Sequence, residues 1–280
     1  MSPRFALVFA TLLAACSGDD TTTADGGDDA AEEQALGNDA SADAAQKDVG
    51  AAADGNSDAT TQSGVPPFGS SSKGTGGANN VSGATQTAGT ITYRLIVPAS
   101  PSVPSPLLIV FSGTEGGATM TNNLIGVGPS TGTSGFIRAV LDGVVYNGNG
   151  AAGATVLDDL RAKYDIDNDR TYLLSESAGT TAGLQLGFHL REPYFAAYWV
   201  NDINASDSPA QTASQIGFAP WGQVGPGGDF TDANTVVAAM TSAGYRLPNP
   251  APYAGSGAGT HGDPNQFIAA VSFFSGKTRK

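Results

Sequence analysis

The sequence Thr-Tyr-Leu-Leu-Ser-Glu-Ser-Ala-Gly, residues 171–179, decides the fold class. Its first four residues predict a buried strand, the pattern small-x-Ser-x-Gly predicts a tight turn, and a helix is expected from Ala178 to about Leu190. A serine at such a turn projects its hydroxyl from the edge of a sheet, and the N–H of the next residue lies at a helix start. The stretch therefore predicts a nucleophile, Ser177, with Ala178 N–H as an oxyanion donor. The alternative is a serine that only caps the helix.

Strands and helices alternate on both sides of this turn. Apolar and β-branched runs predict further strands at residues 90–97, 107–111, 143–146, 196–200 and 215–219. Helical spacing and capping signals predict helices at residues 136–141, 155–164, 233–243 and 264–274. This order predicts an α/β fold, with a mostly parallel sheet covered by helices on both faces, of minimal size and without an evident lid.

The amino-terminal residues are typical of an export signal. Arg4 precedes an apolar run at residues 5–13, which is too short to span a bilayer. Two alanines then precede Cys16, the only cysteine of the chain, and small residues at this place are what the lipoprotein signal peptidase requires. We expect a signal peptide over residues 1–15, lipidation of Cys16 and anchoring to the cell envelope. Ser17 in place of an aspartate favours the outer membrane, with the domain facing the periplasm or the exterior.

Residues 16–87 differ in composition from the rest of the chain. They are rich in Ala, Asp, Gly and Thr and carry most of the net charge of -13. Low hydrophobicity with like charge does not offset the entropy lost on ordering, so this segment predicts a disordered linker before a folded domain at residues 88–280. The domain is near neutral and has no basic stripe, which argues against nucleic acid as a partner. It has no cluster of His and Cys, so no metal or cofactor is expected.

A serine nucleophile needs a base, and the chain has two histidines. His189 lies on the same predicted helix as Ser177, and the length of that helix carries it away from the turn. His261 follows a glycine-rich loop and precedes the last helix, as expected where the order is serine, acid, histidine. A second match to the serine pattern at residues 128–132 has no strand before it and contains Pro129. We therefore reject that match.

The chain resembles the polyhydroxyalkanoate depolymerase and feruloyl esterase group of α/β-hydrolases. The resemblance covers the chain from residue 90 onward. It is most specific where Asp-Ile-Asp-Asn-Asp-Arg-Thr-Tyr, residues 165–172, leads into Ser-Ala-Gly, residues 177–179. It implies an α/β-hydrolase fold and a serine carboxylesterase or polyester depolymerase, in which Ser177 attacks the ester carbonyl and His261 carries the proton.

The same resemblance implies a second oxyanion donor and an acid. The loop after the strand at residues 107–111 supplies the donor, here the N–H of Thr114, although Ser112 stands where the family has histidine. The family's aspartate is missing from its expected place. Asp229 is the first candidate for the acid, and Asp202 and Asp207 are the alternatives.

These departures leave a second class of function open. A missing acid and a replaced histidine favour a surface-binding lipoprotein that keeps a degenerate α/β-hydrolase scaffold without catalysis. The retained Ser177 and His261 favour an enzyme that acts on small or polymeric esters. A structural or adhesive surface protein is the third possibility, and the predicted linker favours it. The sequence names neither the substrate nor the oligomeric state.

Overall fold

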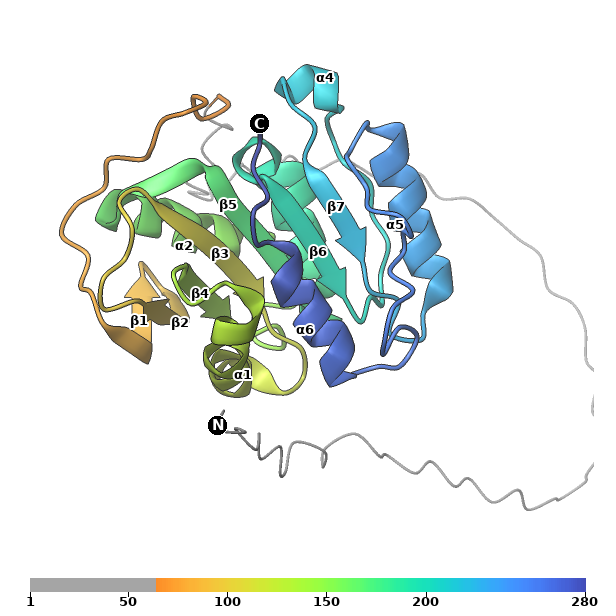
Figure 1. Cartoon of the computed structure of the whole chain (residues 1–280), viewed down its shortest axis with the longest axis horizontal. Coiled ribbons are helices and arrows are strands. Elements are labelled where there is room, and N and C mark those ends of the chain that lie inside the picture. Colours follow the sequence, from red (N-terminus) through yellow and green to blue (C-terminus); the bar gives the residue numbers. More distant parts are fainter. Residues whose placement is uncertain (1–63) are drawn as a thin grey trace, which may run out of the picture. The chain divides into compact units, whose positions relative to one another are not determined.

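A computed structural model describes residues 64–280 of the chain. The predicted signal peptide, the predicted lipidation site Cys16 and residues 16–63 of the predicted linker lie outside the described residues. One sheet holds seven strands in the order β1-β2-β4-β3-β5-β6-β7 (Figure 1). The strands from β3 to β7 are parallel, and β2 runs antiparallel to both β1 and β4. The mostly parallel α/β class predicted from the alternation of elements is confirmed, and so is the α/β-hydrolase-like fold that the resemblance implied.

The elements of the described residues follow one another in chain order. The strands are β1 (Val81–Ala88), β2 (Ile91–Val97), β3 (Ser105–Phe111), β4 (Ile137–Leu141), β5 (Ile166–Glu176), β6 (Ala197–Asn201) and β7 (Trp221–Val224). The α-helices are α1 (Gly116–Thr131), α2 (Gly150–Lys163), α3 (Thr180–Gln185), α4 (Ala213–Ile216), α5 (Phe230–Ser242) and α6 (Pro264–Phe273). Three shorter helical turns are η1 (Ser177–Gly179), η2 (Leu186–Leu190) and η3 (Glu192–Tyr194).

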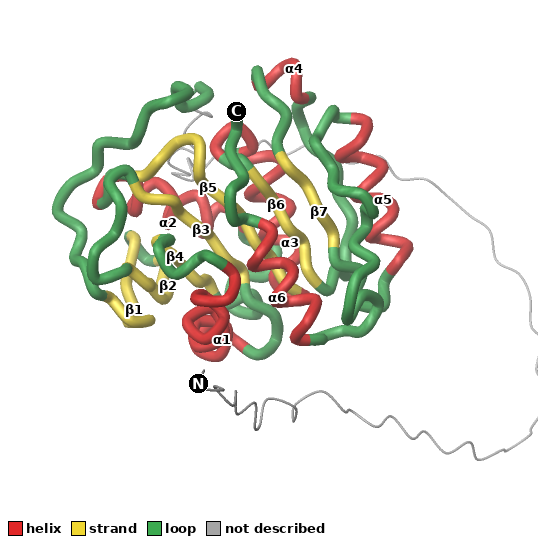
Figure 2. Tube along the Cα trace, in the orientation of Figure 1, coloured by secondary structure: helices red, strands yellow, loops and turns green. Residues whose placement is uncertain are grey.

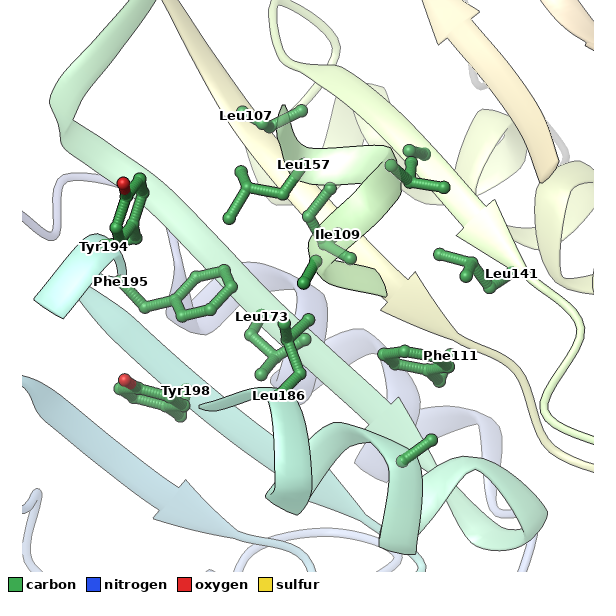
Figure 3. Packing of buried hydrophobic residues seen from close by; sticks show 14 of the residues in the cluster. Leu107, Ile109, Phe111, Leu141, Leu157, Leu173, Leu186, Tyr194, Phe195 and Tyr198 are labelled. Carbon is green, nitrogen blue, oxygen red and sulfur yellow. The ribbon is translucent and has the colours of Figure 1, made fainter. Parts of the chain in front are cut away.

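Helices cover both faces of the sheet, because successive side chains of each strand point to opposite faces. In β3, Leu107 and Ile109 pack in one cluster with residues of α2, α3 and α5. Leu108 and Val110 pack in a second cluster with residues of α1 and α6. Figure 2 shows the strands lying between these helices, and Figure 3 shows Ile109 beside Leu157 of α2. Each such side chain contributes about 1.5–3 kcal/mol on burial, so the sheet that carries the site is rigidly supported.

Two element predictions between β3 and α2 are wrong. Residues 136–141, predicted as a helix, contain strand β4, and residues 143–146, predicted as a strand, form a turn. Arg138 misled the prediction, because it is a charged residue buried inside a parallel strand, with its guanidinium donating to the carbonyl of Leu124 at 2.6 Å. The rejected serine pattern at residues 128–132 lies at the end of helix α1, a helix that the sequence did not predict.

The predicted strand at residues 215–219 is also wrong. The structure has the short helix α4 there, and the strand β7 begins only at Trp221. Thr212 begins α4 through a capping box with Gln215, and Gly217 ends it in a left-handed conformation (φ 82°). Local capping thus takes precedence over the apolar character of this stretch.

The folded part of the chain begins before residue 88. Strand β1 pairs with β2 along its whole length, and the segment before it is tied to β5. Gly69 N–H donates to Asp169 Oδ2 at 2.8 Å, and Ser72 N–H donates to the carbonyl of Ile166 at 2.9 Å. The prediction of a linker up to residue 87 is therefore wrong for residues 64–87. Their polar composition hides an edge strand, which needs apolar residues on one face only.

Both outer edges of the sheet are altered or covered. At one edge, β1 has a bulge between Ser82 and Ala84, where Gly83 takes a left-handed conformation (φ 77°). At the other edge, Arg246 and Tyr253 bracket a segment that runs along β7. Tyr253 N–H donates to the carbonyl of Val224 at 2.8 Å, and Arg246 N–H donates to that of Pro220 at 2.8 Å. Among residues 64–280, no helix has the length and apolarity needed to cross a bilayer.

Candidate active site

The turn that holds Ser177 joins strand β5 to η1 and α3. Ser177 has φ 48°, a left-handed conformation that is rare for a residue with a side chain and that occurs at strained functional turns. A Cβ atom at Gly179 would lie 2.7 Å from both the Cβ of Phe111 and the carbonyl oxygen of Ser112. Only glycine therefore fits at residue 179. This close approach seats the start of the helix against the end of β3.

Ser175 stands where glycine is usual in this kind of turn, and the helix after the turn compensates for it. A Cβ atom at Gly183 of α3 would collide with the Cβ and Oγ of Ser175. In this kind of turn a glycine in the strand usually leaves room for the helix. Here the glycine is in the helix, at residue 183, and it leaves room for the side chain of Ser175. The departure from the usual pattern keeps the geometry of the turn.

The structure brings His261 to Ser177, as the sequence analysis expected. Ser177 Oγ and His261 Nε2 are 3.1 Å apart, within hydrogen-bond distance. Ser177 is buried at 7 % exposure, whereas His261 lies exposed in the loop before α6. His189 lies elsewhere, as expected, and forms an ion pair with Asp207 at 2.8 Å. For Nε2 to accept the serine proton, the other ring nitrogen must carry the hydrogen.

Among the three candidate acids, the structure favours Asp202 over Asp229. Asp229 is the N-cap of α5, and its Oδ1 accepts the N–H of Asp232 at 3.0 Å. Asp207 is engaged with His189. Asp202 follows β6, the strand next to β5, so its carboxylate lies at the same edge of the sheet as the serine turn.

Two donors hold the carboxylate of Asp202 against the loop that carries His261. Its Oδ2 accepts the N–H of Gly262 at 2.7 Å, and its Oδ1 accepts Gln266 Nε2 at 2.6 Å. Burial raises the pKa of Asp202, while the Gly262 bond, the charge of His261 and Gln266 lower it. Asp202 also has φ 47°, so the strand ends in a strained conformation that directs this side chain. Gln266 lies in the first turn of α6, and its side chain holds Asp202.

The loop after β3 lies against the serine turn. A Cβ atom at Gly113 would be 3.3 Å from the Cβ of Ser177. Ser112, where the resemblance led us to expect histidine, accepts the N–H of Gly143 on its Oγ at 3.1 Å and so ties this loop to the turn after β4. Thr114, two residues after Ser112, is exposed, and Ala178 is the second residue of the turn η1, which begins at Ser177. Ala178 thus adjoins the serine, and the loop that carries Thr114 lies against the serine turn.

Two further carboxyl groups lie in the site, and sequence reasoning did not identify them. Glu115 Oε1 accepts the N–H of Gly113 at 3.0 Å, and Asn201 Nδ2 donates to Glu176 Oε2 at 3.4 Å. Burial raises the pKa of both groups, and the charge of Asp202 raises each of them further. The signal that could have found them is their position, directly after β3 and at the end of β5. In residues 64–280, no group of acidic, His and Cys side chains is arranged to hold a metal ion.

Comparison with solved structures places the chain among α/β-hydrolases by fold. A thermostable esterase matches with a TM-score of 0.54 and 16% identity, over 71% of this chain and 64% of the esterase. The chain thus spans somewhat under two thirds of the esterase's length. LpqC, a poly(3-hydroxybutyrate) depolymerase from Bordetella parapertussis, matches with a TM-score of 0.49 and 16% identity, over 68% of this chain and 85% of LpqC. No protein-family profile and no curated protein sequence matches the chain.

Proposed function

We propose that this protein is a serine carboxylesterase in which Ser177, His261 and Asp202 form the catalytic triad. The observation that carries the proposal is the hydrogen-bond distance of 3.1 Å between Ser177 Oγ and His261 Nε2. The serine lies in a strained strand-to-helix turn, and the histidine comes from the loop before the last helix. The α/β-hydrolase fold supports the assignment, since it presents such groups at the carboxyl edge of its sheet.

The steps follow from the positions of these groups. Ser177 Oγ attacks the ester carbonyl carbon while His261 Nε2 takes the serine proton. The N–H groups of Ala178 and Thr114 hold the developing oxyanion. When the carbonyl re-forms, the C–O bond to the alcohol breaks, and His261 returns the proton to the departing oxygen. Water then repeats the sequence on the acyl-serine and releases the acid. Asp202 stabilises the imidazolium, a role that we assign to it in place of Asp229.

A covalent probe tests the proposal directly. The full chain is treated with a fluorophosphonate, and hydrolysis of p-nitrophenyl butyrate is measured beside it for the wild-type, Ser177→Ala and His261→Ala chains. We expect labelling and hydrolysis by the wild type and neither with Ser177→Ala. Labelling that persists in a folded Ser177→Ala chain would refute Ser177 as the nucleophile. A folded wild type that neither labels nor hydrolyses would favour the alternative of a binding protein on an α/β-hydrolase scaffold.

We also propose that Cys16 is lipidated and holds the domain at the cell envelope. The apolar run before two alanines and the lone cysteine supports this, because an exported chain with one thiol needs a use for it. Growth with a radioactive fatty acid should label the wild-type chain and leave a Cys16→Ser chain unlabelled. Equal labelling of both chains, or of neither, would contradict the anchor. Fractionation of the envelope would then test the outer membrane as its location.

A further inference from the structure

A carboxylate is fixed in the wall of the site next to the serine. Glu115 Oε1 accepts the N–H of Gly113 at 3.0 Å. A Cβ atom on Gly113 would lie 2.4 Å from Glu115 Oε2 and 3.3 Å from the Cβ of Ser177. Glu115 and Ser177 therefore flank the same point of the loop. Because the hydrogen bond to Gly113 holds the side chain in place, its charge stays beside any acyl group bound to the serine.

Carboxyl groups from neighbouring strands surround the same place. Asp142 follows β4 and accepts the N–H of Gly117 at 3.0 Å, Glu176 ends β5, and Asp202 follows β6. The charges of Asp142 and Asp202 both raise the pKa of Glu115, which shows that the groups interact. Within residues 64–280, none of these four carboxyl groups forms an ion pair with a lysine or arginine.

Basic side chains gather instead at the opposite edge of the sheet. Arg170 lies at the start of β5 and pairs with Asp167 at 2.7 Å. Arg246 donates to the carbonyl of Ala219, just before β7, at 2.6 Å. Arg279 pairs with Asp169 at 3.0 Å. Two of these three arginines are paired with aspartates there, whereas within residues 64–280 the four carboxyl groups near Ser177 have no lysine or arginine partner, so the end that carries Ser177 is negative.

We propose that Glu115 selects substrates by charge, so that the site accepts esters with an uncharged or cationic acyl group and excludes those that carry a carboxylate beside the scissile bond. This inference rests on the proposed esterase function and names the substrate class for it. A fixed carboxylate that faces a second one across a partly desolvated site weakens transition-state binding, and we expect the effect to be roughly tenfold. The other three carboxyl groups act in the same direction. Glu115 is the one that lies in the loop against Ser177, and its charge can be removed without losing a catalytic group.

The selection should grow with pH. Burial, followed by the charges of Asp142 and Asp202, raises the pKa of Glu115, while its hydrogen bonds to backbone N–H groups lower it. An acid with a raised pKa stays neutral to a higher pH, so its repulsion of an anionic ester appears only as the pH rises through that pKa. Asp142, Glu176, Asp202 and His261 are ionisable groups of the same site. A variant that changes Glu115 alone is therefore needed to isolate its part.

The test compares two esters of similar shape and different charge. p-Nitrophenyl butyrate is neutral, and mono-p-nitrophenyl glutarate carries a carboxylate on its acyl chain. The kcat/KM values are measured for the full chain between pH 5 and 8, as wild type, Glu115→Gln and Asp158→Asn. Glutamine keeps the oxygen that accepts Gly113 N–H and removes only the charge. Asp158→Asn is the matched control. Asp158 pairs with Arg191 at 2.7 Å, and this pair lies outside the site.

We expect Glu115→Gln to raise the ratio of kcat/KM for the glutarate ester to kcat/KM for the butyrate ester about tenfold at pH 8. The preference of the wild type for the butyrate ester should rise with pH, and that rise should be smaller with Glu115→Gln. If Glu115→Gln hydrolyses both esters with the same ratio of kcat/KM values as the wild type, the proposed charge selection is overturned and the proposed esterase function stands. No hydrolysis of either ester by the wild type would overturn the proposed function and the selection with it.

Discussion

The substitution Asp202→Asn tests whether Asp202 is the acid of the triad. Asp229→Asn is its matched control. Asp202 accepts two hydrogen bonds, at 2.7 Å from Gly262 N–H and at 2.6 Å from Gln266 Nε2. Asparagine has one acceptor oxygen, so its amide nitrogen must face one of these donors. A hydrogen bond to a charged group contributes about 1.5–3 kcal/mol, and each 1.4 kcal/mol is about tenfold in rate. Loss of the charge that stabilises the imidazolium adds to this, and in a well-studied protease triad the whole change costs about 10⁴.

We therefore expect kcat for p-nitrophenyl butyrate to fall by about 10² to 10⁴ in Asp202→Asn. Asp229→Asn should keep its activity within about threefold, because asparagine caps a helix about as well as aspartate does. The two chains are compared at equal concentrations of folded protein, set by thermal unfolding. The stopped-flow rate of fluorophosphonate labelling gives a second measure of the activation of Ser177.

The opposite pattern would refute the assignment. If Asp229→Asn loses 10²-fold or more while a folded Asp202→Asn chain stays within about threefold, Asp229 is the acid and the carboxylate beside Gly262 is structural. Small effects from both changes would mean that Ser177 and His261 work as a pair without an orienting carboxylate.

Three further predictions concern stability. Gly183→Ala should destabilise the fold by about 1–3 kcal/mol through collision with Ser175, and Ser175→Gly in the same chain should restore most of the loss in urea unfolding. Burial raises the pKa of Glu192 to about 7, so folding stability should fall between pH 4.5 and 7 by at most about 3 kcal/mol, and Glu192→Gln should remove this slope in thermal unfolding. A chain that starts at residue 88 lacks β1 and should lose cooperative unfolding by circular dichroism, whereas one that starts at residue 64 should keep it.

Local pattern predicts the parts of the site that depend on one turn or one loop. The strand, turn and helix around Ser177 and the glycine-rich loop before His261 could be read from neighbouring residues, and the structure brings the two side chains together. The acid could not be found in this way. Asp202, the acid that we propose, lies after the end of β6, and its nearness to the serine turn depends on β6 lying beside β5. Predicting it requires the order of the strands, which no single stretch of sequence contains.

The errors in the fold have the same origin. Helix α1 contains Pro129 and several glycines, which disfavour a helix, yet Met120 and Leu124 are buried one turn apart against the sheet. Tertiary packing thus outweighs local propensity there. Arg138 in β4 is tolerated in the core because its guanidinium finds the carbonyl of Leu124. In both cases the stabilising partner lies in another element, so the sequence of the element itself does not reveal it.

The covered edges of the sheet bear on how closely such molecules can be crowded together. A free edge strand offers unpaired N–H and carbonyl groups to a neighbouring copy, and association through these groups is a common route to aggregation. Here the segment from Arg246 to Tyr253 occupies the outer side of β7, and its prolines at 248, 250 and 252 have no N–H to offer. At the other end, the bulge at Gly83 interrupts the regular pairing of β1. Many copies held side by side on one surface would thus meet through side chains, and their sheets would stay separate.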